Sequence, residues 1–369
     1  MNIDTRFQTK PLTFLRSEMA CWVGLFTVLL MFTVGSNWLD DLSNPIWFLI
    51  LFLGLSAAIL WAAFGVTRHA DCLAIMLGEP YGTLLLTVAV TGMEVVMIVA
   101  VAFSGSGAPT VARDTMFSVV MIQLNGLVGL ALLIGGLTHR EQYFNIQGNT
   151  SFLAVITALS GLTLILPKLM PVPPWFLIAA TIVLYGTFLG IQTMRHQGYF
   201  KFAETEGDDA VDHGHHGLIL RPKPYHVALL LLTMLSVVLL AKKFAVLIDH
   251  GVNQMGAPVA MGGLLIAVLV LSPEVMSAIK AAGENRMQRS DNIILGATLA
   301  TIGLTVPGVT IASLMTGNAV KLGLDDVGIL LLSLTLLISL INASTGRTNI
   351  LQGLIHLTLF AAFLLTVFV

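Results

Sequence analysis

Long apolar segments recur along the whole chain, and each has about the length needed to cross a lipid bilayer. A transmembrane helix requires about 20 consecutive apolar residues. Of the 369 residues, 56% are hydrophobic and only 10% are charged, whereas soluble proteins carry about 25% charged residues. The sequence therefore predicts an all-α polytopic membrane protein with about eleven transmembrane helices. They are predicted at residues 18–36, 45–66, 82–104, 115–138, 150–168, 175–194, 225–246, 257–281, 291–316, 326–342 and 350–369.

The first apolar segment, residues 19–35, has a second interpretation. It follows Arg6, Lys10 and Arg16, as the apolar region of a signal peptide would. It is long for that role, and no clear small-residue cleavage site follows it. We therefore expect it to be a transmembrane helix.

The basic residues predict the orientation of the chain, because cytoplasmic loops carry an excess of lysine and arginine. When the N-terminus is placed in the cytoplasm, thirteen of the 18 lysines and arginines fall in cytoplasmic segments. The expected arrangement is therefore a cytoplasmic N-terminus and an external C-terminus.

Two glutamates, Glu94 and Glu274, lie in the middle of long apolar runs. A carboxylate in hydrocarbon costs at least a few kcal/mol and usually marks a path for ions or protons. The two positions are 180 residues apart, and residues 82–95 match residues 262–275 at seven of fourteen positions. Glu94 lies on the third predicted helix and Glu274 on the eighth; the two are five spans apart, an odd number, so their helices run in opposite directions. This pattern is typical of the inverted repeats of secondary transporters.

The repeat suggests how the chain is divided. We expect an N-terminal segment with one helix at residues 1–44 and a first five-helix repeat at residues 45–195. A cytoplasmic acidic and histidine-rich loop follows at residues 196–223, and a second five-helix repeat occupies residues 224–369.

The loop contains His213, His215 and His216 among several carboxylates. It is either a solvated linker or a segment that senses cations or pH, since imidazoles and carboxylates are plausible ligands for divalent ions.

Polar residues near the two glutamates suggest a cation- and proton-binding site. Hydroxyl groups and freed backbone carbonyls are natural ligands for hard cations, and a proline such as Pro273 frees a carbonyl one turn earlier. Helix packing through hydrogen bonds is the alternative role for each lone polar residue, including Gln123 and Thr301. The predicted site residues are Glu94, Glu274, Thr91, Ser272, Asn125 and Thr298.

In this prediction Glu94 and Glu274 hold the transported cation, and no cofactor is expected. Glu79, Asp114 and Asp291 lie near helix ends, where they either line an access route or are solvated interfacial groups. His69, beside Arg68, is either a sensor of cytoplasmic pH or an ordinary interfacial residue.

Several long and unusual strings occur along the chain, in addition to the glutamate segments and the histidine-rich loop. They are Arg68-His-Ala-Asp71, Gly78-Glu-Pro-Tyr-Gly82, Arg113-Asp114, Asn253-Gln-Met-Gly-Ala-Pro258, Leu271-Ser-Pro-Glu274, Leu304-Thr-Val-Pro307, Met315-Thr-Gly-Asn318 and Ser344-Thr-Gly-Arg-Thr-Asn349. Over nearly its whole length the chain resembles the ChaA-type antiporters of bacteria, which belong to the calcium/proton exchangers of the cation/calcium antiporter superfamily.

The resemblance implies one helix followed by two inverted five-helix repeats in the inner (plasma) membrane of a bacterium. It also implies export of cytoplasmic Ca²⁺, Na⁺ or K⁺ in exchange for external protons. Glu94 and Glu274 match the paired acidic residues of the family. The asparagine that usually stands three positions earlier is replaced by Thr91 and Leu271, and Ala300 stands in place of a glutamine, although Thr298 keeps a hydroxyl. Fewer polar ligands indicate a looser site that accepts monovalent cations.

The predicted function is a secondary active cation/proton antiporter that works by alternating access, with Glu94 and Glu274 shared between the cation and protons. A cation channel or uniporter without proton coupling is the alternative. An intramembrane hydrolase is disfavoured, because none of the nine histidines forms a His-Glu-x-x-His motif. The expected partners are the lipid bilayer, inorganic cations and protons, and no basic patch indicates nucleic acid.

Overall fold

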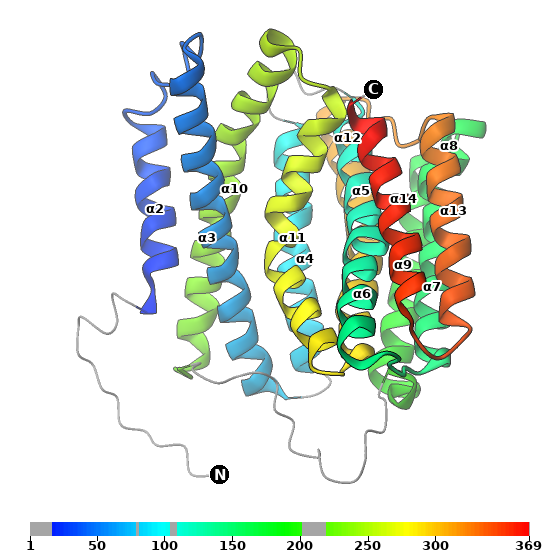
Figure 1. Ribbon diagram of the computed structural model, residues 1–369. Helices are drawn as coiled ribbons and strands as arrows, with labels where there is room; N and C mark the ends of the chain where they lie inside the picture. Colours follow the sequence, from blue (N-terminus) through cyan, green and yellow to red (C-terminus); the bar gives the residue numbers. More distant parts are fainter. Residues whose placement is uncertain (1–16, 79–80, 104–108, 201–218, 369) are drawn as a thin grey trace.

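The computed structural model describes residues 17–78, 81–103, 109–200 and 219–368 (Figure 1). Within these ranges the chain forms eleven helical spans, three of which contain a short π-helical stretch. They are α2 (Met19–Phe32), α3 (Pro45–Leu77), α4 (Tyr81–Ala102), α5 (Val111–Met121) with η1 (Ile122–Leu127) and α6 (Val128–His139), α7 (Ile146–Ser160) with η2 (Gly161–Ile165) and α8 (Leu166–Leu169), α9 (Pro174–Gly190) with η3 (Ile191–Arg195), α10 (Lys223–Met255), α11 (Val259–Gly283), α12 (Met287–Thr316), α13 (Asp326–Ala343) and α14 (Ile350–Phe368).

Nine of the described spans are long and apolar enough to cross a membrane, and α2 and the middle of α4 are shorter apolar helices. Large apolar side chains such as Leu53, Leu137 and Ile182 remain exposed on the outside of the bundle. Exposure of these side chains to water would be unfavourable, but lipid tails are equally apolar and can cover them. The predicted polytopic all-α fold is confirmed.

Two helices, α3 and α10, are longer than the sequence predicts, and each contains 33 residues. The apolar pattern ends near residues 66 and 246, where charged residues appear. The helices nevertheless continue, because residues near these ends contact neighbouring helices; His250 of α10 lies against Phe48 of α3. His69 of α3 is buried against α10. Hydropathy marks the apolar layer rather than the end of the helix.

Local sequence signals explain where α3 begins and ends. The Asn44 side chain accepts hydrogen bonds from the backbone N–H groups of Ile46 and Trp47, at 3.0 and 3.3 Å, and Pro45 occupies the first helical position. Both features are typical of a helix start. The helix ends at Gly78, which has a φ angle of +69°, a conformation that costs glycine little.

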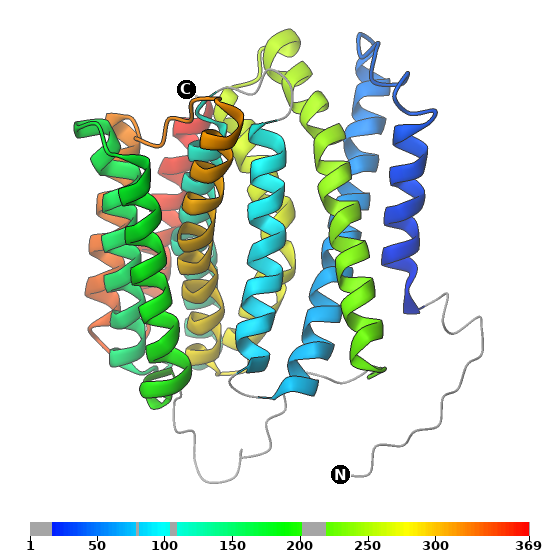
Figure 2. The same ribbon diagram turned by 180° about the vertical axis from the view of Figure 1, so that it is seen from behind.

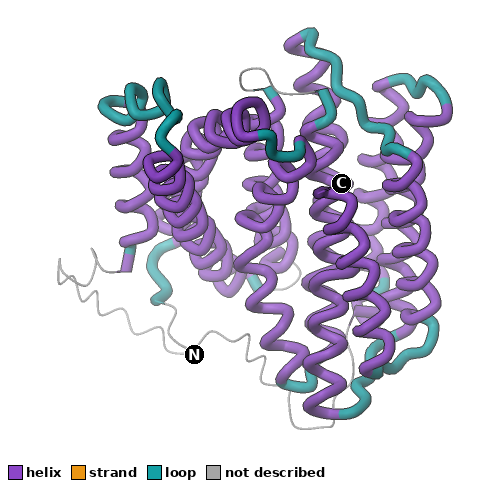
Figure 3. The backbone as a smooth tube through the Cα atoms, turned by 45° about the horizontal axis from the view of Figure 1, so that its top comes forward, coloured by secondary structure: helices purple, strands orange, loops and turns teal. Residues whose placement is uncertain are grey.

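The helices form two groups with α4 and α11 between them (Figures 1 and 2). One group contains α2, α3 and α10, and the other contains the spans from α5 to α9 together with α12, α13 and α14. Helix α4 packs against α3 and α10 on one side and α12 on the other, whereas α11 packs against α3, α5 and α12. The tube view in Figure 3 shows the same grouping from nearer the top of the bundle.

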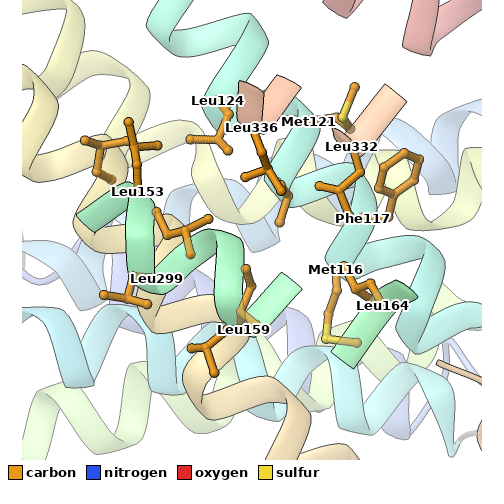
Figure 4. Packing of buried hydrophobic residues seen from close by; sticks show 14 of the residues in the cluster. Met116, Phe117, Met121, Leu124, Leu153, Leu159, Leu164, Leu299, Leu332 and Leu336 are labelled. Atoms are coloured by element: carbon orange, nitrogen blue, oxygen red, sulfur yellow. The ribbon is translucent and has the colours of Figure 1, made fainter. Parts of the chain in front are cut away.

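The larger group has an extensive apolar core (Figure 4). Side chains from α5, α7, α12 and α13 interdigitate there and exclude both lipid and water. Because lipid is as apolar as these side chains, their contribution comes mainly from close packing rather than from the hydrophobic effect. The residues labelled in Figure 4 are Met116, Phe117, Met121, Leu124, Leu153, Leu159, Leu164, Leu299, Leu332 and Leu336.

Glycines allow one especially close contact, between α6 and α14. A Cβ atom added to Gly353 would lie 2.8 Å from the backbone nitrogen of Leu133 and 3.0 Å from the carbonyl oxygen of Gly129. Two helix backbones therefore approach each other at this point as only small residues permit.

The described spans alternate in direction, so α2 begins and α14 ends at opposite ends of the bundle (Figure 1). Helices α4 and α11 run in opposite directions, as the sequence predicts. We call the end at which α2 begins the Glu18 end, since Glu18 is the residue that precedes this helix.

Candidate functional site

Glu94 lies in the middle of α4, where its side chain is only 3% exposed. Its Oε2 atom accepts a hydrogen bond of 2.7 Å from Thr301 Oγ1 on α12. Its Oε1 atom is buried and has no hydrogen-bond partner among the described residues. Thr91 is also buried and lies one turn earlier on the same face of α4. This carboxyl group therefore keeps one oxygen available for a ligand.

Glu274 lies in the middle of α11, directly after Pro273, and is partly buried. Its Oε2 atom is 3.4 Å from the donor Gln123 Nε2, which is a long hydrogen bond. The Gln123 Oε1 atom is buried without a partner among the described residues. Helix α12 packs against both α4 and α11, the helices that carry the two glutamates.

The two donors have a reciprocal arrangement. Gln123 belongs to η1, in the span that follows the helix of Glu94, but it contacts Glu274. Thr301 belongs to α12, which follows the helix of Glu274, but it contacts Glu94. Each glutamate is therefore held by a side chain from the other half of the sequence.

Irregular backbone accompanies both carboxylates. Gln123 lies in the π-helical stretch η1, and π-helical turns inside α-helices frequently occur at functional sites. Pro273 lies inside α11 beside Glu274 and cannot donate to the carbonyl four residues earlier. Both irregularities change the hydrogen bonding of backbone groups in a region where lipid offers them no hydrogen-bond partner.

The side chains of three other predicted site residues form hydrogen bonds with groups other than the two glutamates. Ser272 and Thr298 donate their hydroxyl groups to carbonyl oxygens of their own helices, at 2.6 and 2.8 Å. The amide of Asn125 donates to Thr335 Oγ1 at 2.7 Å, and its oxygen lies 3.1 Å from His356 Nδ1. Asn125 therefore ties η1 to α13 and α14.

Gln123 and Thr301 contact the two glutamates, but the sequence did not predict them as site residues. Both appeared as polar residues in apolar helices, but helical spacing alone did not distinguish them from packing residues. Only the three-dimensional arrangement of α4, η1, α11 and α12 identifies them as the donors to the two carboxyl groups.

The residues expected near the ends of the helices have different surroundings. Asp114 is paired with Arg113, with Nη2 and Oδ1 2.6 Å apart, and Arg113 also donates to the carbonyl oxygen of Gly323 at 3.0 Å. This pair ties α5 to the segment before α13. The predictions for Glu79, His213, His215 and His216 fall outside the described residues.

Asp291 is not the solvated interfacial group that its position near a helix end suggested. It is 5% exposed, and its Oδ2 atom accepts a hydrogen bond of 2.5 Å from Asn149 Nδ2. It lines a cavity of about 40 Å³ together with Ser339, Asn342 and His356. Apolar side chains complete the lining of this cavity, and its volume has room for water beside the polar groups. The reason for the difference is that α7 packs against α12, and its Asn149 contacts the first turns of that helix.

The arrangement favours binding of a small cation by few charged ligands. Within the described part of the chain, no group of three or more His, Cys, Asp or Glu residues could hold a metal ion. A cation between α4 and α11 would therefore receive two carboxylates and neutral oxygens, which is the ligand chemistry of hard cations. The unpartnered Glu94 Oε1 atom is available for this purpose.

A polytopic bundle with two opposed carboxylate helices defines a membrane transporter of inorganic cations. The sequence matches the family described as sodium/calcium exchanger protein over residues 47–194 and 225–369, and the chain belongs to this family. The resemblance stated from the sequence is thereby confirmed.

Two relatives are similar over most of their length. The chain is 40% identical to the sodium-potassium/proton antiporter ChaA of Escherichia coli (strain K12) over 341 residues, which cover 90% of this chain and 92% of that protein. It is 41% identical to the putative ionic transporter y4hA of Sinorhizobium fredii over 327 residues, which cover 86% and 88% of the two chains.

Solved structures share the fold. Native YfkE aligns with a TM-score of 0.70 at 17% identity and covers 94% of this chain and 99% of its own. The H⁺/Ca²⁺ exchanger CAX aligns with a TM-score of 0.66 at 17% identity, over 93% and 88% of the two chains.

Proposed function

We propose that this protein is a secondary active cation/proton antiporter in which Glu94 and Glu274 are occupied alternately by a cation and by protons. The main support is the pair of intramembrane carboxyl groups on antiparallel helices, each contacted by a side-chain donor from the opposite half of the chain. Similarity to the sodium-potassium/proton antiporter of Escherichia coli also supports the exchange of cations for protons.

The coupling of cation movement to proton movement follows from the free-energy cost of placing a net charge in the membrane. Deprotonated Glu94 and Glu274 hold the cation, while Thr301 and Gln123 orient the carboxylates. Protonation neutralises both groups and releases the cation. An empty site with two negative charges is too costly to reorient, so only the cation-loaded and protonated forms exchange between the two sides. Two carboxyl groups allow up to two protons per cation.

A duplicated unit accounts for the helix positions. Helices α3 and α10 begin 178 positions apart, at residues 45 and 223, and end 178 positions apart, at residues 77 and 255. We propose that residues 45–195 and 224–369 are inverted repeats, with residues 1–44 as an added segment and residues 196–223 as a connecting loop. Alternating access would then be movement of one part of the bundle against the other around the fixed site.

The transported ions are proposed to be Na⁺, K⁺ or Ca²⁺. The two carboxylates can balance one divalent ion, but few other charged ligands are available, which favours a site that also accepts monovalent ions. No resident cofactor is proposed. We further propose that the Glu18 end faces the cytoplasm of a bacterial cell and that α14 ends on the external side, because the basic residues favour this orientation.

A channel or uniporter would use the same carboxyl groups without moving protons. An enzymatic role has less support, because the relatives with a stated activity are antiporters. The experiment that separates these functions uses purified protein in vesicles that contain a pH-sensitive dye and have an imposed proton gradient. Ca²⁺, Na⁺ and K⁺ are added separately, and proton movement is recorded.

Glu94→Gln and Glu274→Gln are the test variants. Glu141→Gln is the matched control, because Glu141 is an exposed carboxylate 3.6 Å from Arg347 at the surface. Antiport predicts cation-triggered proton movement in the wild type and the control, and its loss in both test variants. Cation uptake without proton movement would establish a channel or uniporter instead, and full exchange in Glu94→Gln would exclude the proposed site.

A further inference from the structure

A second group of titratable side chains lies at the Glu18 end of the bundle, where α2, α3 and α10 meet. It contains His69 of α3 and His226 of α10, which are only 1% and 2% exposed. Their Nδ1 atoms are 3.0 Å apart, so they share one hydrogen bond between two helices. Neither histidine contacts Glu94 or Glu274.

The neighbours of the two rings fix which nitrogen atoms carry protons. The backbone N–H of Arg221 points at His226 Nε2 from a distance of 3.0 Å, so this nitrogen accepts and carries no proton. In a neutral ring the proton must then be on Nδ1 of His226. This atom donates to His69, and Nδ1 of His69 is therefore the acceptor.

The same logic continues to Glu18. A neutral His69 that accepts at Nδ1 carries its proton on Nε2, which lies 3.1 Å from Glu18 Oε2. The chain of donors therefore runs from Arg221 through His226 and His69 to the Glu18 carboxylate. Tyr225 donates to the other oxygen of Glu18 at 2.6 Å. Arg68 Nη2 lies 3.2 Å from His69 Nε2, and both of these nitrogen atoms contact Glu18 Oε2, which accepts from the two donors.

An additional proton on either ring would break one of these hydrogen bonds. On His69 Nδ1 it would face the N–H of His226 across 3.0 Å. On His226 Nε2 it would face the backbone N–H of Arg221, also across 3.0 Å. Either position replaces a hydrogen bond by two opposed donors. If the proton of His226 moves from one nitrogen to the other, the conflict moves with it but does not disappear.

We propose that His69 and His226 form a second proton-binding site, separate from Glu94 and Glu274, and that a proton bound there breaks the link between α3 and α10. The surrounding titratable groups come from three helices and the residues that precede two of them. They are Glu18 and Cys21 at the start of α2, Arg68 and Cys72 of α3, Arg221 before α10 and Tyr225 in its first turn. They include two guanidinium groups and one carboxylate, so an added proton enters a cluster with an excess of positive charge.

The histidine pair lies on helices that pack against a transport helix. Both α3 and α10 pack against α4, which carries Glu94. Opening of the α3–α10 contact would therefore change the packing of that helix, and acidification at the Glu18 end would slow exchange. This regulatory consequence depends on the transport function proposed above, whereas the proton-dependent opening does not.

The opening can be measured without transport, by the distance between two spin labels. Leu77 and Val227 are 39% and 41% exposed and lie at the ends of α3 and α10 on the Glu18 side, so cysteines placed there can be labelled. The native Cys21 and Cys72 are buried free thiols and are replaced by alanine first. The distance distribution is recorded from about pH 7 down to about pH 4, so that the range extends below the ordinary titration of histidine.

Two substitutions preserve part of the chain of donors but cannot titrate. In His69→Gln the amide N–H replaces Nε2–H toward Glu18, and in His226→Asn the amide N–H replaces Nδ1–H toward His69. His250→Gln is the matched control, because His250 lies at the other end of α10 and contacts Phe48.

We expect a longer-distance population to grow on acidification in the wild type, in His250→Gln and in Glu94→Gln, and to be absent in His69→Gln and His226→Asn. A distance that does not change in the wild type, or a change that persists in both histidine variants, would overturn the proposal. In vesicles, the two histidine variants should also lose the several-fold slowing of exchange at acidic pH on the Glu18 side. Failure of transport alone, with the distance change intact, would count against the antiport function rather than against this proton site.

Discussion

Thr301 on α12 donates a 2.7 Å hydrogen bond to Glu94 on α4, across 207 positions of sequence. The corresponding contact in the other half, from Gln123 to Glu274, is 3.4 Å long. The two carboxyl groups are therefore held with unequal strength, although their helices are related by a similar sequence pattern. This difference leads to different expectations for the two donors.

Replacing Thr301 by valine should weaken cation binding strongly. The substitution keeps the shape of the side chain but removes the only described donor to a buried carboxylate, and a hydrogen bond to a charged group contributes about 1.5 to 3 kcal/mol. The cation concentration for half-maximal exchange should rise by roughly ten-fold or more. Vesicle exchange assays measure this change, and Thr301→Ser, which keeps the hydroxyl, should remain close to the wild type. Equal loss in both variants would show that packing, not the hydrogen bond, is responsible.

Replacing Gln123 by methionine should have a smaller effect. The donor and acceptor are 3.4 Å apart, beyond the usual range for a strong hydrogen bond. The change in half-maximal cation concentration should stay below that of Thr301→Val in the same assay. A larger effect would mean that Gln123 acts through its oxygen as a direct cation ligand.

Asp291 should contribute to stability through its contact with Asn149. Asp291→Asn keeps an acceptor for the Asn149 amide, and its unfolding free energy should be close to that of the wild type. Asp291→Leu leaves this buried donor unpaired, which should lower the free energy of unfolding by about 1 to 3 kcal/mol. Unfolding of the detergent-solubilised protein at neutral pH measures both values. Greater stability in Asp291→Leu would instead show that burial of the carboxyl group is the larger cost.

Glu18 should make the stability of the protein depend on pH. Burial raises the pKa of this carboxyl, but hydrogen bonds from His69 and Tyr225 and the charge of Arg68 outweigh it and lower the pKa from 4.5 to about 2. Because the folded pKa lies below the unfolded one, the stabilisation is fully present above pH 4.5 and is lost as the pH falls toward 2. A shift of this size corresponds to about 3 kcal/mol.

The measurement compares the wild type with Glu18→Gln in thermal unfolding at a series of pH values. The variant should be less stable at pH 7, and the gap should close as the pH falls toward 2. Glu141→Gln, which alters an exposed carboxylate, should show no comparable gap. A gap for Glu18→Gln that is the same at every pH would contradict the assigned cause.

Several features could be derived from the sequence because they depend on local composition. Each apolar run must satisfy its own backbone in lipid and therefore forms a helix, so the number of spans and most of their bounds follow directly. The exceptions are the ends of α3 and α10, where polar residues continue the helix beyond the apolar layer. Glu94 and Glu274 could be selected because an ionisable residue in an apolar run is costly anywhere in the membrane.

The sequence by itself determined the helices, their alternating direction and the two carboxylates, because these follow from the length and polarity of each segment. The tertiary structure decided which side chains meet: Thr301 with Glu94, Gln123 with Glu274, and His69 with His226. It also places Asp291 at a cavity inside the bundle rather than at the expected interface. The physical reason is that a hydrogen bond between helices depends on their relative rotation and depth, and these are fixed only when all the helices pack together.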